Sequence, residues 1–305
     1  MSNLQNLKSA LRPPPLKAGD LLRVIAPSGA LREFEAFNQG VEIWKSRGYR
    51  IKISDNIDNR HGYLAGTDAQ RRQQLATAWQ DPECKGILCA RGGFGSTRIL
   101  EDWTWPENII TPKWLIGFSD VTALLWSLYN AGICSLHGPV LTTLADEPES
   151  SIGRLFDIVE GRPIPPLKGQ GWGGGTVTGA LLPGNLTVAT HLLGTPLLPD
   201  LDGVILALED VTEAPYRIDR MLTQWRLSGA LSKVRGIALG GFTKCEAPPN
   251  VPSLTIEEVL QDRLSDLNIP IVSNLPFGHD NPNAALPVGV QVTLDATAGI
   301  LEIKK

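Results

Sequence analysis

Short apolar segments alternate with helical patterns along the first half of the chain, and this alternation restricts the folds that it can adopt. Strands are predicted at 21–26, 49–53, 86–90 and 114–116. Helices are predicted at 33–47, 67–79 and 96–101, and another follows residue 120. Apolar strands that alternate with helices indicate an α/β fold whose parallel sheet is covered on both faces. Ligands bind such sheets beyond the carboxyl ends of the strands, so the turns after Ala26, Ala90 and Gly117 should gather at one edge.

A change in composition near residue 160 divides the chain, which has 305 residues and is about twice the usual length of a domain. Residues 161–175 are rich in proline and glycine and are predicted to form a linker. We expect an N-terminal domain over 1–165 and a C-terminal domain over 176–305. The C-terminal part is predicted to contain strands at 176–182, 203–208, 234–239 and 270–275, helices at 185–193, 216–228 and 256–264, and a hairpin or edge strands at 289–303.

The segment 114–126 joins a predicted strand to a predicted helix with no room for a loop. Its turn, Gly117-Phe-Ser-Asp120, would hold the Ser119 hydroxyl on a sharp bend with the positive end of the helix behind it. This is the geometry of a nucleophile elbow, although Val121 replaces the second glycine of the usual Gly-x-Ser-x-Gly pattern. Alternatively, Ser119 or Asp120 only caps the helix, and these residues taken alone favour the cap.

An activated serine needs a base, and the base needs a carboxylate that orients it. His279 lies in a turn after a predicted strand, where catalytic groups of such sheets are found, and His137 follows a short apolar segment and could also face the site. His61, in a polar loop, and His191, within an apolar helical pattern, are predicted to be structural. A hydrogen bond to the backbone is an equally good explanation of His279.

The carboxylates are harder to rank from the sequence. Glu209 ends the apolar strand at 203–208 and is expected at the same sheet edge as His279. A salt bridge to Arg217 or Arg220 is the alternative for Glu209. Asp280 competes with it as the group that orients His279, although neighbouring residues seldom reach this geometry.

The loop Arg91-Gly-Gly-Phe-Gly95 follows a predicted strand and precedes a helix. Its backbone amides could bind a phosphate or stabilise an oxyanion beside Ser119. The spacing matches neither Gly-x-Gly-x-x-Gly nor Gly-x-x-x-x-Gly-Lys-Ser/Thr. A phosphate- or nucleotide-binding protein that uses Gly92 to Gly95 is therefore a distant alternative.

Composition excludes several classes of function. The net charge of −4 gives no basic surface for nucleic acid. The chain has no apolar run of about 18 residues and no apolar leader at its N-terminus, so we expect no membrane partner and a cytoplasmic location. Four scattered cysteines without a Cys-x-x-Cys pair suit free thiols in a reducing compartment, and together with four scattered histidines they predict no metal site.

Seven motifs occur in one order from about residue 17 to the end of the chain. They are Ile25-Ala-Pro-Ser-Gly29, Ala90-Arg-Gly-Gly-Phe-Gly95, Ile116-Gly-Phe-Ser-Asp120, His137-Gly-Pro139, Pro183-Gly-Asn-Leu186, Leu208-Glu-Asp210 with Glu213-Ala-Pro-Tyr-Arg-Ile-Asp219, and Pro276-Phe-Gly-His279. Together they resemble the LD-carboxypeptidase family of serine peptidases, which also contains the microcin C immunity hydrolases. Phe94 stands where many members have tyrosine.

The resemblance implies a flavodoxin-like N-terminal domain with a parallel sheet, a β-rich C-terminal domain, an active site at their interface, and a homodimer. It assigns the nucleophile to Ser119, the acid of the triad to Glu209 and the histidine to His279. It assigns the oxyanion hole to the backbone amides of Gly93 and Asp120. It implies neither a metal nor another cofactor.

The activity implied by the resemblance is hydrolysis of the bond between an L-centre and a terminal D-alanine in a cytoplasmic murein tetrapeptide. The same three residues could act instead on a microcin-like aminoacyl-nucleotide or another peptide amide. A carboxypeptidase binds a free carboxylate, and Arg91 is our hypothesis for this role because it begins a loop at the predicted active edge. A structural ion pair is an equally good explanation of Arg91.

Overall fold

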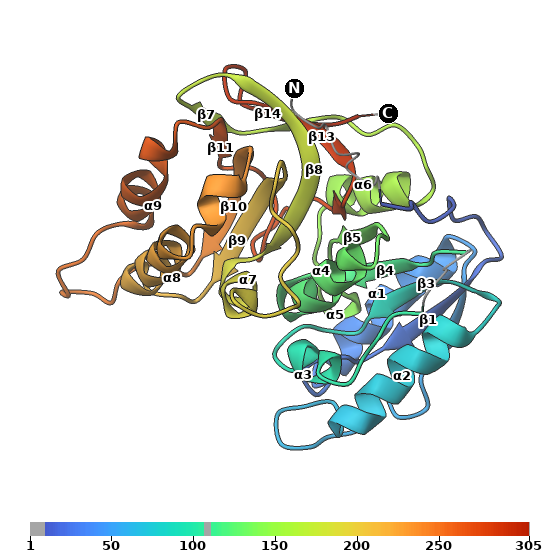
Figure 1. Ribbon diagram of the computed structural model, residues 1–305. Helices are drawn as coiled ribbons and strands as arrows, with labels where there is room; N and C mark the ends of the chain where they lie inside the picture. The colour runs from blue at the N-terminus through green and yellow to red at the C-terminus, as the bar shows by residue number, and fades with distance from the viewer. Residues whose placement is uncertain (1–9, 107–110, 305) are drawn as a thin grey trace.

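The computed structural model describes residues 10–106 and 111–304 and contains two β-sheets that lie side by side (Figure 1). The first sheet has the strand order β12-β5-β4-β3-β1-β2. Its strands are β1 (Leu21–Ile25), β2 (Arg50–Ile53), β3 (Cys84–Cys89), β4 (Trp114–Gly117), β5 (Ser135–His137) and β12 (Leu286–Val288). Strands β1 to β5 are parallel, and β12 is antiparallel to β5. The order of the parallel strands is the flavodoxin-like order, so the predicted fold class is confirmed.

Helices cover both faces of the first sheet. They are α1 (Phe34–Ser46), α2 (Asp68–Gln80), α3 (Ser96–Leu100), α4 (Thr122–Asn130), α5 (Leu141–Leu144) and α6 (Glu149–Val159). Helices α1, α5 and α6 share a core with one face, and α2, α3 and α4 share a core with the other. Successive side chains of a strand point to opposite faces, so Val24 of β1 lies in one core and Ile25 in the other.

The sequence patterns assign neither α5 nor α6. Helix α5 is a single turn, too short for a periodic pattern. Helix α6 follows Pro148 and has no side-chain cap, so the usual signal for a helix start is missing.

The second sheet has the strand order β6-β14-β13-β8-β9-β10-β11-β7. Its strands are β6 (Leu167–Lys168), β7 (Gln170–Trp172), β8 (Thr176–Asn185), β9 (Ile205–Val211), β10 (Gly236–Thr243), β11 (Ile271–Ser273), β13 (Gln291–Asp295) and β14 (Ile300–Ile303). Strands β8 to β11 are parallel, and the outer strands are antiparallel to their neighbours. Three helices belong to this half, namely α7 (Leu186–Leu192), α8 (Pro215–Leu227) and α9 (Ile256–Leu264). Single 3₁₀ turns complete the structure: η1 (Ser119–Val121), η2 (Ala230–Lys233) and η3 (Ser265–Leu267).

Two segments differ from the simple division into two domains and a linker. Residues 161–175, predicted as a linker, contribute β6 and β7 to the second sheet. Strand β12 comes from the C-terminal part of the chain but pairs with β5 of the first sheet. The predicted hairpin at 289–303 forms as β13 and β14.

The two halves also share a hydrophobic core. Trp126 of α4 lies in one continuous cluster with Leu182 of β8 and Leu186 of α7, and α4 contacts α7. Trp126 Nε1 donates a hydrogen bond of 2.8 Å to the carbonyl oxygen of Pro183. Helix α4 begins immediately after the predicted nucleophile, so this contact joins the serine turn to the second half of the molecule. None of the helices in the described ranges has the length and apolarity needed to cross a membrane.

Candidate active site

Ser119 lies on a strained turn between β4 and α4. Its φ of 61° is in the left-handed region, which serine rarely adopts, and strain of this kind is typical of functional sites. The turn is tight because β4 ends at Gly117, where an added Cβ would lie 3.0 Å from Val121 Cγ1. The structure therefore gives Ser119 the elbow geometry predicted from its position between strand and helix.

His279 connects Ser119 to Glu209. Its Nε2 lies 3.0 Å from Ser119 Oγ, and its Nδ1 lies 2.6 Å from Glu209 Oε2. Glu209 is near the carboxyl end of β9 and is fully buried, whereas His279 follows β11 and its side chain is 18% exposed. Because a carboxylate only accepts, Nδ1 carries a proton toward Glu209, and in the neutral ring Nε2 is then free to accept the serine proton.

Asn185 holds the buried carboxylates in place. Its Nδ2 lies 3.3 Å from Glu209 Oε1 and 3.1 Å from Asp210 Oδ1. Its Oδ1 accepts a hydrogen bond from the backbone amide of Val188 and caps α7. The backbone amide of Asn185 donates to Thr122 Oγ1 of α4. The side chain and the backbone amide of Asn185 thus link β9, α7 and the helix that follows Ser119. An asparagine between a strand and a helix is a cap signal in the sequence, but the bonds of Asn185 to Glu209 and Asp210 depend on segments that are distant in the chain.

The charges around His279 favour its protonated form. Burial by itself lowers the pKa of the imidazole, but the hydrogen bond and the charge of Glu209, with smaller effects of Asp210 and Asp280, raise it above the ordinary value. Burial raises the pKa of Asp210, and hydrogen bonds from the amide of Val211 and the side chain of Thr187 oppose this. Glu209, rather than Asp280, is the carboxylate that contacts the imidazole.

The glycine loop after β3 lies against the serine. An added Cβ on Gly92 would be 3.1 Å from Ser119 Cβ and 3.2 Å from its Oγ, so only glycine leaves the hydroxyl free. Gly93 has a φ of 108°, a conformation that glycine adopts without strain. The Asp120 carboxylate accepts from the Ser96 amide at 2.8 Å, and the Ser96 hydroxyl donates to the Asp120 carbonyl. These bonds tie the loop and α3 to the serine turn.

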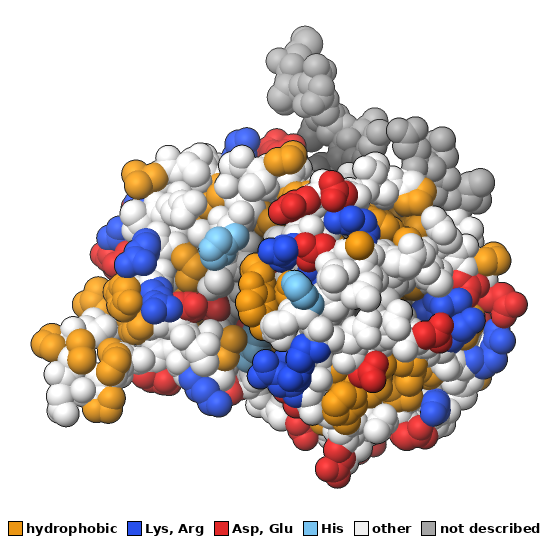
Figure 2. All heavy atoms as spheres, turned by 90° about the horizontal axis from the view of Figure 1, so that it is seen from below, with side chains coloured by type: hydrophobic (Ala, Val, Ile, Leu, Met, Phe, Trp, Pro, Cys, Tyr) orange, Lys and Arg blue, Asp and Glu red, His pale blue; other side chains and the backbone are white. Residues whose placement is uncertain are grey.

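Ser119 opens into a cavity of about 370 Å³ between the two halves. The residues around it come from both halves and are Gly93, Phe94, Thr97, Ser119, Asp120, Asn185, Thr187, Val188, His191, Asp210, Val211 and Glu213. The space-filling view shows a furrow between the two lobes, with histidine side chains beside it (Figure 2). The cavity includes Gly93 and Asp120, the residues predicted to supply the oxyanion hole.

The structure separates the remaining histidines. His191 was predicted to be structural, but it is exposed on α7 and lines the cavity, because the helical pattern could not show which face α7 turns to solvent. His137 is fully buried between Phe118 and Phe277, and neither ring nitrogen has a hydrogen-bond partner among the described residues. The pKa of His137 is lowered to about 3, mainly by burial and in addition by the charge of His279.

Arg91 begins the glycine loop but is not among the cavity residues found in the described part of the chain. Its guanidinium donates to the carbonyl of Ala30 at 3.0 Å and lies 3.4 Å from a carboxylate oxygen of Glu33. The alternative of a salt bridge from Glu209 to Arg217 or Arg220 is wrong: among the described residues Glu209 pairs with His279, and Arg217 pairs with Glu213 at 3.3 Å.

A comparison with known proteins identifies the family. Residues 22–138 match the LD-carboxypeptidase N-terminal domain, and residues 178–294 match the LD-carboxypeptidase C-terminal domain. The chain belongs to the LD-carboxypeptidase family. It is 60% identical to a putative carboxypeptidase of Synechocystis over 96% of this chain and 97% of the relative.

Solved structures agree with this family. A crystal structure of a muramoyltetrapeptide carboxypeptidase from Oxalobacter formigenes is 31% identical, with a TM-score of 0.81 over 93% of this chain and 97% of that one. The microcin C7 self-immunity protein MccF of Escherichia coli, in complex with aspartyl sulfamoyl adenosine, has a TM-score of 0.87 over 97% of this chain and 98% of that one. Its sequence identity is 23%, so this likeness concerns the fold alone.

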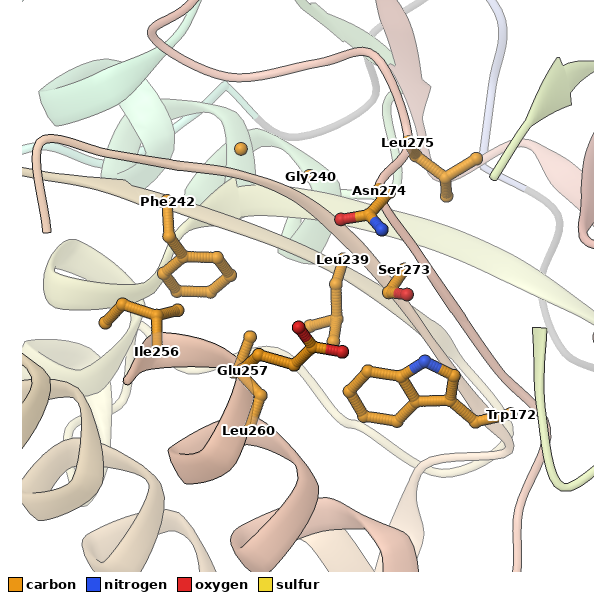
Figure 3. Close-up of a pocket in the computed structure, with 11 residues that line it drawn as sticks. Trp172, Leu239, Gly240, Phe242, Ile256, Glu257, Leu260, Ser273, Asn274 and Leu275 are labelled. Atoms are coloured by element: carbon orange, nitrogen blue, oxygen red, sulfur yellow. The ribbon is translucent and has the colours of Figure 1, made fainter. Parts of the chain in front are cut away.

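This LD-carboxypeptidase family member has a second cavity, of about 340 Å³, away from Ser119 (Figure 3). Trp172 of β7 and Phe242 of β10 lie on either side of it, and Glu257 of α9 lies between them. None of the residues that line this cavity, in the described ranges, belongs to the first one. Among the described residues, no group of three histidine, cysteine or carboxylate side chains is placed to hold a metal ion.

Proposed function

We propose that this protein is a serine-type LD-carboxypeptidase that releases the terminal D-alanine from murein tetrapeptide in the cytoplasm, during cell-wall recycling. The observation that carries the proposal is the hydrogen-bonded series Ser119, His279 and Glu209 at the edge of one cavity. The similarity to a muramoyltetrapeptide carboxypeptidase supports the substrate class.

In this mechanism, Ser119 Oγ attacks the carbonyl carbon of the bond before D-alanine, and His279 Nε2 takes the serine proton. The tetrahedral intermediate collapses to an acyl-enzyme when His279 gives that proton to the leaving amine of D-alanine. Water then attacks the acyl-enzyme with His279 again acting as the base. Glu209 holds the tautomer of the imidazole and stabilises its positive charge.

The backbone amides of Gly93 and Asp120 are proposed to stabilise the oxyanion. Their position in the same cavity as Ser119, with Gly92 packed against the serine, supports this role. Loss of one such donor typically costs about 100- to 1,000-fold in rate.

Arg91 remains our proposal for the residue that binds the terminal carboxylate. Its present partner, Glu33, is on the surface, so a substrate carboxylate would replace one anion by another beside the guanidinium. Arg91→Ala should raise KM for the tetrapeptide more than for an analogue amidated at its C-terminus. An equal increase for both peptides would assign Arg91 to structure alone.

The function is tested by mass-spectrometric detection of D-alanine released from a defined murein tetrapeptide, with Ser119→Ala as the control. We expect release by the wild-type enzyme and none by the variant. An aminoacyl sulfamoyl adenosine assayed in parallel tests the microcin-like alternative, and faster hydrolysis of this compound would replace the murein assignment. Saturable nucleotide binding without hydrolysis of either compound would favour a phosphate-binding role for Gly92 to Gly95.

A further inference from the structure

The turn after β1 lies against the glycine loop that follows β3, and no step of the proposed mechanism uses this turn. It is Pro27-Ser-Gly29, part of the first of the seven motifs. The Gly29 amide donates to the carbonyl of Gly92 at 3.1 Å. A Cβ added to Gly93 would lie 3.3 Å from Gly29 Cα, so the two segments are closely packed. The position of Gly93, one of the proposed oxyanion donors, therefore depends on this turn.

Arg71 of α2 joins the turn to the glycine loop. Its side chain is fully buried, and its Nη1 donates to the carbonyl oxygens of Pro27 at 2.5 Å and of Gly95 at 2.6 Å. Gly95 has a φ of 127°, and a Cβ added there would lie 2.7 Å from Arg71 Nη1. Glycine at this position therefore lets the backbone approach the guanidinium. One nitrogen atom thus holds two segments that are far apart in the sequence.

The charge of Arg71 is paired with that of Asp68, which lies one turn earlier on α2. Asp68 accepts a hydrogen bond from Arg71 Nη2, and it also accepts from Arg98 of α3 at 2.6–3.1 Å. The hydrogen bond from Arg98 is the main cause that lowers the pKa of Asp68 to about 2, so this carboxylate is ionised at neutral pH. A buried charge is stable when it is paired and hydrogen-bonded. Arg71 therefore keeps its charge inside the protein.

The bond from Arg71 to Gly95 also reaches the second proposed oxyanion donor. Ser96, the next residue, donates from its amide to the Asp120 carboxylate at 2.8 Å and from its hydroxyl to the Asp120 carbonyl. A shift of Gly95 would therefore disturb both Gly93, in the same loop, and Asp120, beside the nucleophile. Such a shift matters because oxyanion donors act only when they are fixed about 3 Å from the developing charge.

We propose that Arg71 is a positioning residue for the oxyanion hole: its guanidinium fixes the Pro27 turn and the glycine loop, and through them the amides of Gly93 and Asp120. This inference rests on the proposed function and adds a residue that does not touch the substrate. Displaced amides would stabilise the transition state less and leave the binding of the uncleaved peptide unchanged. Loss of the guanidinium should therefore lower kcat and have little effect on KM.

The test compares Arg71→Met with Arg154→Met and measures kcat and KM for D-alanine release together with Tm. Methionine fills much of the volume of arginine and removes its donors. Arg154 of α6 is the matched control because it is also buried and also donates to two backbone carbonyls, those of Ala285 at 3.0 Å and Pro165 at 2.6 Å. Neither carbonyl belongs to the glycine loop.

We expect Arg71→Met to lower kcat about 100-fold, the cost of a displacement of about 1 Å in an active site, and to change KM by no more than about twofold. Arg154→Met should lower Tm by a similar amount and keep kcat within about twofold of the wild-type value. Arg71→Lys keeps the charge but lacks the planar guanidinium, so its kcat should lie between those of Arg71→Met and the wild-type enzyme.

An equal fall of kcat in Arg71→Met and Arg154→Met would overturn the inference, because both residues would then act through stability alone. A rise of KM at unchanged kcat in Arg71→Met would also overturn it. Should Arg71→Met fail to fold, Arg71→Lys decides the question, and a kcat equal to the wild-type value would count against the inference.

Release of no D-alanine by the wild-type enzyme would refute the proposed function instead. Hydrogen exchange then tests the position of the loop without any activity. The amides of Gly29 and Ser96 should exchange about tenfold faster in Arg71→Met than in Arg154→Met, because a lost hydrogen bond makes local opening easier by about this factor. Equal exchange rates in the two variants would show that Arg71 does not hold the loop.

Discussion

Three side chains at positions 119, 209 and 279 meet although 160 residues separate the first from the last. A different feature marks each position: the backbone of Ser119 is strained, Glu209 is completely buried, and His279 makes two hydrogen bonds. Groups that act as one catalytic unit have effects that do not add, because loss of any one stops the same step.

The first prediction at this scale concerns that unit. Ser119→Ala, Glu209→Ala and His279→Ala should each lower kcat by several orders of magnitude, and the Ser119→Ala/His279→Ala double variant should be little slower than either single variant. Initial rates of D-alanine release measure the effect, and circular dichroism checks the fold. Independent losses that multiply in the double variant would show that the residues do not work together.

The second prediction concerns pH. His279 must be neutral to act as a base, and Glu209 raises its pKa, so kcat/KM should rise with pH and level off above the ordinary histidine pKa of about 6.5. In Glu209→Gln the charge that favours the imidazolium is lost, so the pKa of His279 should fall. NMR titration of the imidazole in Ser119→Ala and in the double variant with Glu209→Gln measures this shift. His137, with a pKa of about 3, should not titrate near neutrality and is an internal control.

At the scale of elements, the three groups come from the carboxyl ends of β4 and β9 and from the loop after β11, and Asn185 holds the end of β9 to α7 and α4. A parallel sheet places the carboxyl ends of its strands at one edge, which is why residues from distant segments can meet. Here two such edges, one from each sheet, face the same cavity. Asn185 belongs to both the helix cap and the bonding of the buried carboxylates.

The substitution Asn185→Ala should therefore lower the free energy of unfolding by more than the loss of a helix cap alone. A lost cap costs about 1 kcal/mol, and buried carboxylates that lose a donor add roughly 1–3 kcal/mol. The free energy of unfolding should fall by their sum, and kcat should fall because Glu209 loses a donor. Thr255→Ala removes the cap of α9 and is the matched control, with the cap loss alone and no change in kcat. Equal effects of the two substitutions in urea unfolding and activity would contradict this role of Asn185.

At the scale of the whole molecule, the two sheets are joined by a strand, hydrogen bonds and a shared core. The chain returns to the first sheet at β12, and the Asn283 amide before this strand donates to Glu147 Oε2 at 2.8 Å. The core that contains Trp126 continues into α7 and β8. Each half would therefore lose part of its buried surface and several hydrogen bonds if it were separated from the other.

We accordingly expect one cooperative transition in calorimetric unfolding, and a fragment of residues 1–165 that does not fold stably. Trp126→Phe removes a hydrogen bond between the halves and should lower the single Tm by the equivalent of about 1 kcal/mol. Trp105→Phe removes a bond of equal length, 2.8 Å, within the first half and is its matched control. Two resolved transitions, of which Trp126→Phe shifts only one, would refute this account.

The homodimer remains a prediction, and light scattering on the same samples tests it.

The local patterns of the sequence predict most of the strands and helices and the strand-to-helix turn of Ser119, because periodicity, caps and turns depend on neighbouring residues, but they miss α5, α6 and β12. The residue patterns did not choose between His279 and His137 as the base, or between Glu209 and Asp280 as the carboxylate that orients it. Only the co-ordered family motifs favoured one residue of each pair. Only the folded chain shows that His137 is buried between two phenylalanines, that His191 lines the cavity, and that β12 joins the first sheet. These outcomes depend on contacts between segments far apart in the chain, and no local pattern contains that information.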